Sequence, residues 1–385
     1  MAAEKMAAFN WSHLVNPAAR MTDRMDNSII QYIGWNVEVE DLIHIPKHWR
    51  QYPAPDKSLH LLLGMIYIFL CVAAFVGNGL VLWIFSSARS LRTASNIFVV
   101  NLAFCDLIIF LMMPIFVYNS FGQGFSAGWL ACQVYAMIGS FSGIGAGMTN
   151  ACIAYDRYMI ITRPFEGKMS RTKAIIMILF VWTYATPWAV LPMLEIWGKF
   201  MPEGYLTACS FDYLTTSYDN KLFVGSIFTF SYVIPMSFIL YFYSQIVSKV
   251  FSHEKSLRDQ AKKMNVDSLR ANQQQKSETA ELRIAKAALT VCFMFVMSWT
   301  PYAVLALTGA FGDQSLLTPG VAMVPALTCK LVSCIDPYIY AISHPKYRIE
   351  LQRRLPWLSL NEPNDTQSTV TESSAPLSAL STTMT

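Results

Sequence analysis

Residues 316–342 read LLTPGVAMVPALTCKLVSCIDPYIYAI, an apolar stretch long enough to cross a membrane as a helix. Lys330 lies in the middle of it. A charge at the centre of a bilayer costs roughly 2.5–3.5 kcal/mol on insertion scales, so we expect Lys330 to be paired, neutralised or used in chemistry. An amine in an apolar pocket favours its neutral, nucleophilic form, which reacts readily with aldehydes. The stretch therefore predicts a membrane helix with a functional lysine.

The composition is that of an integral membrane protein. Of the 385 residues, 54% are hydrophobic and 14% are charged, and the mean hydropathy is +0.35. Seven stretches are each long enough for a transmembrane helix, with approximate spans of 60–85, 97–118, 130–155, 174–194, 222–247, 287–311 and 317–342. The histidines are scattered without the spacing of a metal site, so a soluble enzyme is not expected.

Basic residues follow every second span. They lie at Arg89 and Arg92, at Arg163, Lys168, Arg171 and Lys173, and from Lys249 to Lys286. By the positive-inside rule these loops and the C-terminus are cytoplasmic, and the N-terminus is outside the cell. Asn10, in Asn-Trp-Ser, is then a glycosylation candidate on the correct side.

The expected organisation is one membrane domain between two tails. An extracellular tail covers 1–58, the seven-helix domain 59–344, an amphipathic interfacial helix 345–357, and a disordered Ser/Thr-rich cytoplasmic tail 358–385. The polar segment between the fifth and sixth spans has few β-branched residues and spaced charges, so both helices are expected to continue out of the membrane.

Two of the eight cysteines differ from the rest in position. Six fall inside spans, where a small apolar residue is the simpler interpretation. Cys132 begins the third span at its outer end, and Cys209 lies in the outer loop after the fourth. Both face an oxidising compartment, so a disulfide between them is predicted.

Only three Asp, Glu, Lys or Arg side chains fall inside the spans: Asp106, Lys330 and Asp336. Each is a functional candidate by default. A buried ion pair between Lys330 and Asp336 is the structural alternative. However, their separation of six residues places them about 9 Å apart along a helix and on different faces, and Pro337 disturbs the helix there.

Short motifs occur in order, each on its own span. They are Gly77-Asn78, Asn101-Leu102-Ala103 with Asp106, Asp156-Arg157-Tyr158, Trp182, Pro235, Ser298-Trp299-Thr300-Pro301, and Asp336-Pro337-Tyr338-Ile339-Tyr340. From about Trp49 to about residue 355 the chain resembles a visual opsin of the rhodopsin-like G-protein-coupled receptor class, most closely the short-wavelength arthropod group. The resemblance implies an all-α bundle of seven transmembrane helices with a short interfacial helix, in which Asn78 and Asp106 are polar intramembrane residues.

The resemblance implies that Lys330 binds 11-cis-retinal, or 11-cis-3-hydroxyretinal, as a protonated Schiff base. The positive charge then needs a counterion. Vertebrate visual opsins carry a glutamate where this chain has Tyr135, so the remaining match is Glu203, six residues before Cys209. Without the resemblance, Glu203 is more simply interpreted as a solvated loop carboxylate.

Pro301 leaves a bend in the helix where the Trp299 ring can press on a ligand. Trp299 also resembles the aromatic residue that senses retinal shape in this family. Tyr135 and Trp299 are therefore expected in the chromophore pocket. Gly143, Gly145 and Gly147 lie mid-membrane without the strand-to-helix turn of a phosphate loop, and are interpreted as close-approach positions.

The cytoplasmic residues resemble those that couple opsins to transducers. Asp156, Arg157 and Tyr158, with Asp336, Pro337 and Tyr340, match the family's switch positions, although Asp156 and Arg157 also suit a plain ion pair at a helix end. The third-loop sequence His253-Glu254-Lys255 resembles that of opsins that couple to a Gq-type G protein. The tail offers sites for a receptor kinase, and added phosphates would recruit arrestin. No nucleic-acid partner is expected.

Met112 bears on colour. Ultraviolet members of the arthropod group carry a lysine at the position of Met112, two residues before Pro114, so its absence favours a visible, blue-sensitive pigment.

The expected function is a visual pigment of the photoreceptor (rhabdomeric) cell membrane that activates a Gq-type G protein after cis-to-trans photoisomerisation. One alternative is a non-visual opsin or retinal photoisomerase on the same fold. A more distant one is a transporter or channel with Asp106 and Asp336 along an ion path, against which the lack of paired broken helices counts.

Overall fold

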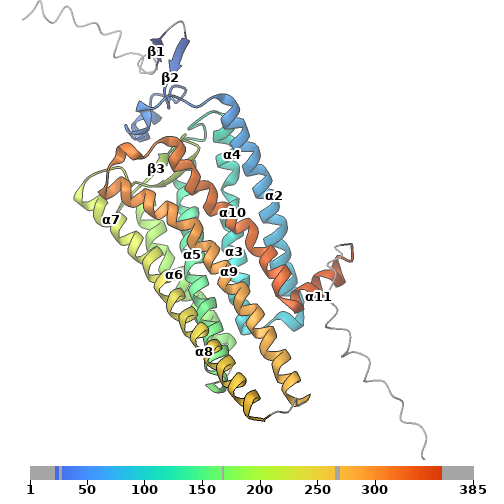
Figure 1. Ribbon diagram of the computed structural model, residues 1–385. Coiled ribbons are helices and arrows are strands. Elements are labelled where there is room, and N and C mark those ends of the chain that lie inside the picture. The colour runs from blue at the N-terminus through green and yellow to red at the C-terminus, as the bar shows by residue number, and fades with distance from the viewer. Residues whose placement is uncertain (1–21, 26–27, 167–168, 265–268, 358–385) are drawn as a thin grey trace, which may run out of the picture.

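The computed structural model describes residues 22–25, 28–166, 169–264 and 269–357, and within them seven helical rods are long and apolar enough to span a membrane. They pack side by side as one bundle (Figure 1). In chain order the rods are α2 (Lys57–Ser87), α3 with α4 (Ala94–Leu111 and Met113–Phe121), α5 (Gly128–Thr162), α6 (Arg171–Met193), α7 with the π-helical turn η7 and α8 (Tyr218–Phe228, Thr229–Val233 and Ile234–Met264), α9 (Leu269–Phe311) and α10 (Pro319–Ser343). The predicted seven-helix fold is confirmed.

Local sequence sets several of the helix ends. The Asp56 carboxylate accepts a hydrogen bond from the backbone N–H of Ser58 and begins α2, and the Thr93 hydroxyl caps α3 in the same way. Pro114 lies in the first turn of α4 and has no N–H to donate, so the second rod is interrupted at Met112. Helices α8 and α9 run well past their apolar spans, as the polar third-loop sequence predicted.

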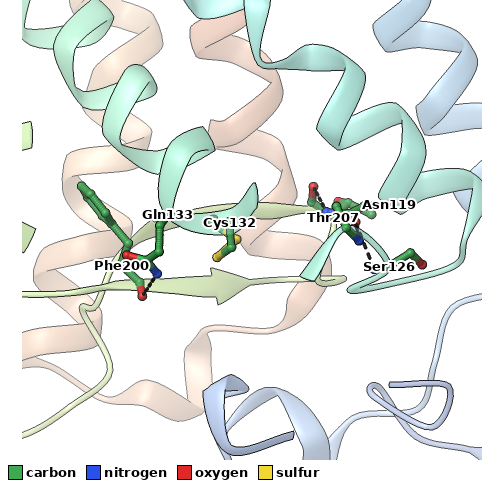
Figure 2. The surroundings of a disulfide bond; sticks show 8 residues. Asn119, Ser126, Cys132, Gln133, Phe200 and Thr207 are labelled. Carbon is green, nitrogen blue, oxygen red and sulfur yellow. Dashed lines mark hydrogen bonds between the residues drawn. A yellow bond between two sulfur atoms is a disulfide. The ribbon is translucent and has the colours of Figure 1, made fainter. Parts of the chain in front are cut away.

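A short antiparallel hairpin covers one end of the bundle. Strand β3 (Phe200–Glu203) pairs with β4 (Ala208–Phe211), and the predicted disulfide joins Cys209 to Cys132 at the start of α5 (Figure 2). The Gln133 amide donates to the carbonyl of Phe200 at 3.2 Å. The disulfide fixes the hairpin covalently to the start of α5. A cross-link between residues 77 positions apart also stabilises the fold by about 4.5 kcal/mol in the chain-entropy model, because it restricts the unfolded chain.

Part of the segment expected to be an outer tail packs on this same end. A hairpin of β1 (Thr22–Met25) and β2 (Ser28–Gln31) is followed by two 3-10 turns, η3 (Asp41–His44) and η4 (Trp49–Gln51). Trp49 is fully buried, and the His44 ring stacks on Trp129 with a 3.9 Å centroid separation. The His48 Nε2 lies 2.6 Å from the carbonyl oxygen of Leu317. These contacts make the segment a cap on the bundle.

At the opposite end, α11 (Pro345–Arg354) turns away from α10 (Figure 1). The His344 ring accepts a hydrogen bond from the Tyr347 N–H and caps the helix. Tyr347 and Leu351 are buried on one side, and Tyr347 stacks on Phe85 of α2. The helix is therefore docked on the bundle by one face.

Candidate functional site

A cavity lies inside the bundle and is closed on one side by the β3–β4 hairpin. Its wall includes residues from α3, α5, the turn η7, α9 and α10, and is mostly apolar or aromatic. The polar side chains on the wall include Tyr135, Glu203, Ser231 and Lys330. Such an enclosure, apolar with a few convergent polar groups, is the usual form of a small-molecule site.

Lys330 is buried on the cavity wall, with 9% of its surface exposed. Its Nζ donates to the carbonyl oxygen of Ala326 at 3.0 Å and lies 5.9 Å from the centre of the Tyr135 ring. Within the described part of the chain Lys330 has no ion pair, and the intrahelical pair with Asp336 is absent. The buried Tyr135 hydroxyl lies near enough to Lys330 to interact with its amine and makes no other hydrogen bond among the described residues. The amine thus faces the cavity beside a polar neighbour.

Glu203 is buried at the end of β3, with 5% of its surface exposed, so the interpretation as a solvated loop carboxylate is wrong. Its Oε2 accepts hydrogen bonds from the hydroxyls of Tyr213 at 3.0 Å and Tyr302 at 3.4 Å. Burial raises the pKa of Glu203 to about 7, against the opposing influence of the Lys330 charge and these two hydrogen bonds.

Glu203 and Lys330 line the same cavity, but they make no ion pair within 4.0 Å in the described structure. Sequence reasoning missed Tyr213, whose hydroxyl holds Glu203. The sequence feature that points to Tyr213 is its position four residues after Cys209. The disulfide that fixes the hairpin also restrains the residues directly after β4, so their side chains stay near the cavity. The hydroxyls of Ser210 and Tyr302 are hydrogen-bonded as well, which extends the polar network along the hairpin.

Trp299 lines the cavity and lies against Gly143 of α5. A Cβ on Gly143 would stand 2.4 Å from Cη2 of Trp299, which is an impossible distance. A Cβ on Gly145 would meet Cys105 Sγ at 3.0 Å, and one on Gly147 would meet the Phe295 ring at 2.9 Å. The interpretation of these glycines as close-approach positions is confirmed.

Replacing Gly143 with alanine is expected to displace Trp299 and to destabilise the protein by about 1–3 kcal/mol, because the added methyl overpacks the wall. Gly139 supplies a matched control on the same helix and cavity, since a Cβ there has nothing within 4 Å. Thermal unfolding should show a lower Tm for Gly143→Ala than for Gly139→Ala. Equal melting temperatures would contradict the proposed contact.

Three polar residues deeper in the bundle are buried, and two of them, Asp106 and Asp336, are near enough to interact electrostatically. Asn78 donates to the carbonyl of Ser333 at 2.8 Å, and Asp106 and Asp336 are both buried. Asp106 Oδ2 and Asp336 Oδ1 have no hydrogen-bond partner among the described residues. The structure therefore gathers the intramembrane polar residues of α2, α3 and α10.

At the end of the bundle near α11, Asp156 and Arg157 form a buried ion pair. The Ser95 hydroxyl donates to Asp156 at 2.9 Å and ties the pair to α3. Tyr158 follows on α5 and contacts Phe242 of α8. Pro337 packs against Gly77 of α2, where an added Cβ would stand 2.7 Å from its ring.

Several predicted site residues fall outside the described structure. The side chains of His253, Glu254, Lys255 and Tyr340 lie outside it, although their backbones belong to α8 and α10. Asn10 and the Ser/Thr-rich tail lie outside the described residues altogether. Their assignments remain predictions.

Comparison with known proteins gives consistent matches. Residues 77–340 match the model of the 7 transmembrane receptor (rhodopsin family). An ultraviolet-sensitive opsin of Apis mellifera is 61% identical over 88% of this chain and 92% of its own, and a blue-sensitive opsin of the same species is 50% identical over 87% and 89%. The crystal structure of squid rhodopsin superposes with a TM-score of 0.77 at 34% identity, covering 83% of this chain and 92% of that one.

Proposed function

The chain belongs to the opsins of the rhodopsin family of seven-transmembrane receptors, and we propose that it attaches retinal at Lys330. As an opsin it is a light-activated receptor of the G-protein-coupled class, a visual pigment and not an enzyme. The observation that supports attachment at Lys330 is that its amine is buried on the wall of an apolar cavity. A lysine in that position is costly unless it is used.

The residues present fit a long apolar ligand with an aldehyde at one end. Aromatic and aliphatic side chains surround the body of the cavity, and the Tyr135 hydroxyl lies beside Lys330. Retinal, when bound, supplies light absorption and a change of shape. We assign 11-cis-retinal, or its 3-hydroxy form, to this cavity.

Trp299 and Arg157 are proposed to connect the cavity with the transducer. Trp299 touches both the cavity and Gly143, so a change of shape in the cavity acts on the α5–α9 contact. If the two shapes of retinal favour different packings of α9, the change of shape shifts the populations of these two packings. Arg157, held by Asp156 in this structure, would then be released toward a Gq-type G protein at the end of the bundle near α11. Arrestin and a receptor kinase are the proposed later partners, through the tail.

Orientation follows from the charge pattern. The hairpin, the disulfide and the N-terminus are proposed to lie outside the cell, and α11 and the tail inside, in a rhabdomeric photoreceptor membrane. The Cys132–Cys209 bridge is consistent with an oxidising exterior.

The function is tested by reconstituting the purified chain with 11-cis-retinal in the dark and illuminating it with purified Gq. A visible band and light-dependent nucleotide exchange are expected. A visible band without exchange would favour the retinal photoisomerase instead, and exchange that is independent of light would contradict both.

Colour is a separate proposal, and it rests on Met112. Overall identity is higher to the ultraviolet-sensitive relative than to the blue-sensitive one, whereas Met112 favours a visible pigment. Met112 lines the cavity at the interruption between α3 and α4, so a charge there acts directly on the ligand site.

Met112→Lys is expected to move the absorbance maximum from the visible to the ultraviolet, because a second cation in the cavity disfavours a positive charge at Lys330 Nζ. Absorbance spectroscopy of the dark pigment measures this, with Met112→Leu as the uncharged control. A lysine variant that absorbs like the control would contradict the role of Met112, and an ultraviolet wild-type pigment would contradict the blue proposal.

A further inference from the structure

A second, polar groove lies between α5 and α8, two helices that pack along each other toward the end of the bundle opposite the hairpin (Figure 1). Tyr158 of α5 and Arg163, directly after that helix, line it on one side. The α8 wall consists of Gln245, Ser248, Lys249 and Ser252. These four residues are spaced i, i+3, i+4 and i+7, so they share one face of the helix. We call these six residues the basic groove.

The donors of the basic groove are exposed and largely uncommitted. Lys249, Ser248 and Ser252 make no side-chain hydrogen bond or ion pair with any described residue. Arg163 bonds Glu166 at 3.1 and 3.2 Å, but both side chains are about half exposed, and such a surface pair is weak and easily exchanged. Arg163 and Lys249 are positive and Glu166 is negative, so the groove and its surroundings carry a net charge of +1, which favours binding of an anion.

The groove lies where two membrane spans end. The apolar spans predicted for the third and fifth rods, 130–155 and 222–247, end beside the residues that line the groove, so the groove is expected at the level of lipid headgroups. On the same stretch of α8, Tyr241, Val247 and Phe251 expose 52%, 43% and 68% of their surface. Apolar side chains beside a basic groove at a membrane boundary suit a ligand with acyl chains and a phosphate.

We propose that the basic groove binds the headgroup of an anionic phospholipid of the phosphoinositide class. The phosphate groups on the inositol ring of such a headgroup can accept hydrogen bonds from Lys249 and Arg163 at the same time. The Ser248 and Ser252 hydroxyls and the Gln245 amide are further donors. The proposal rests on α11 and this end of the bundle lying inside the cell, since these lipids belong to the cytoplasmic leaflet.

Native mass spectrometry of the full chain tests this directly. The protein is placed in phosphatidylcholine nanodiscs containing phosphatidylinositol bisphosphate, and the bound lipids are counted as their fraction rises. Lys249→Gln and Arg163→Gln are each expected to weaken binding about fivefold, since a basic residue near an anionic surface contributes about 1 kcal/mol. Lys286→Gln, an exposed lysine of α9 outside the groove, should bind like the wild type.

Three outcomes would overturn the proposal. The two groove variants could bind the lipid as the wild type does, phosphatidylserine could bind as tightly as the bisphosphate lipid, or soluble inositol trisphosphate could displace the lipid completely at equal concentration. The last result would identify a site for free phosphates. Because Lys249 is exposed, its variant is expected to keep the wild-type Tm, and a restored affinity in Lys249→Arg would show that charge is what matters.

Discussion

Lys330→Ala is expected to abolish covalent chromophore binding completely. Among the described residues, Lys330 is the one lysine that lines the cavity, and its Nζ is buried there with a single carbonyl as hydrogen-bond acceptor. A carbonyl compound bound in the cavity has no other described amine within it. The alanine variant therefore loses the nucleophile without losing the cavity.

The measurement is the mass of the denatured protein after incubation with 11-cis-retinal in the dark and reduction with borohydride. Wild type should gain one retinyl group, located on Lys330 by peptide mapping, whereas Lys330→Ala should gain none. Lys286→Ala is the control, because it removes a lysine from the exposed surface of α9 and should keep the adduct. An adduct that survives in Lys330→Ala would place the attachment elsewhere.

The spans and Lys330 were predictable because hydropathy and helix length are local properties of the sequence. An apolar stretch has few ways to satisfy its backbone in a membrane other than as a helix. The same argument makes any charge within it conspicuous, which is why Lys330, Asp106 and Asp336 are recognisable from the sequence without any knowledge of their contacts. The disulfide followed from the positive-inside rule, which predicts that Cys132 and Cys209 lie outside the cell.

The burial of Glu203 could not be predicted in this way, because it depends on contacts between distant parts of the chain. Tyr302 comes from α9, and Cys132, which anchors the hairpin, comes from α5. The cap formed around Trp49 has the same origin, since its apolar residues follow no helical or strand period. In both cases, burial depends on contacts with residues that are distant in the sequence.

Glu203→Gln is the second large effect, expected in the pigment as loss of the visible band at neutral pH. Glu203 is the described carboxylate on the cavity wall that contains Lys330, and the Tyr213 and Tyr302 hydroxyls hold it in place. A proton held at Lys330 Nζ leaves a positive charge in a low-dielectric cavity, and the Glu203 carboxylate opposes it. Glutamine keeps the shape and removes the charge, so the nitrogen loses its proton and absorbance moves to the ultraviolet.

Titration of the dark pigment gives the size of the effect. Removing an opposite charge typically moves such an equilibrium by about 1–3 pH units, so the pH at which the visible band disappears should fall by that amount in Glu203→Gln. Glu195→Gln is the matched control, an exposed carboxylate at the same end of the bundle. An unchanged spectrum with an unchanged titration midpoint would exclude Glu203 as the counterion and direct attention to Tyr135.

The protein without retinal provides an independent test with a defined sign. Burial raises the pKa of Glu203 from 4.5 to about 7, so between these values the folded state binds more protons than the unfolded state. The free energy of unfolding should therefore fall as pH rises through this window, by about 3 kcal/mol as an order of magnitude. Glu203→Gln should lack this part of the pH dependence. Chemical unfolding at pH 5 and pH 8 would show it, and identical slopes in both proteins would mean that Glu203 is ionised throughout.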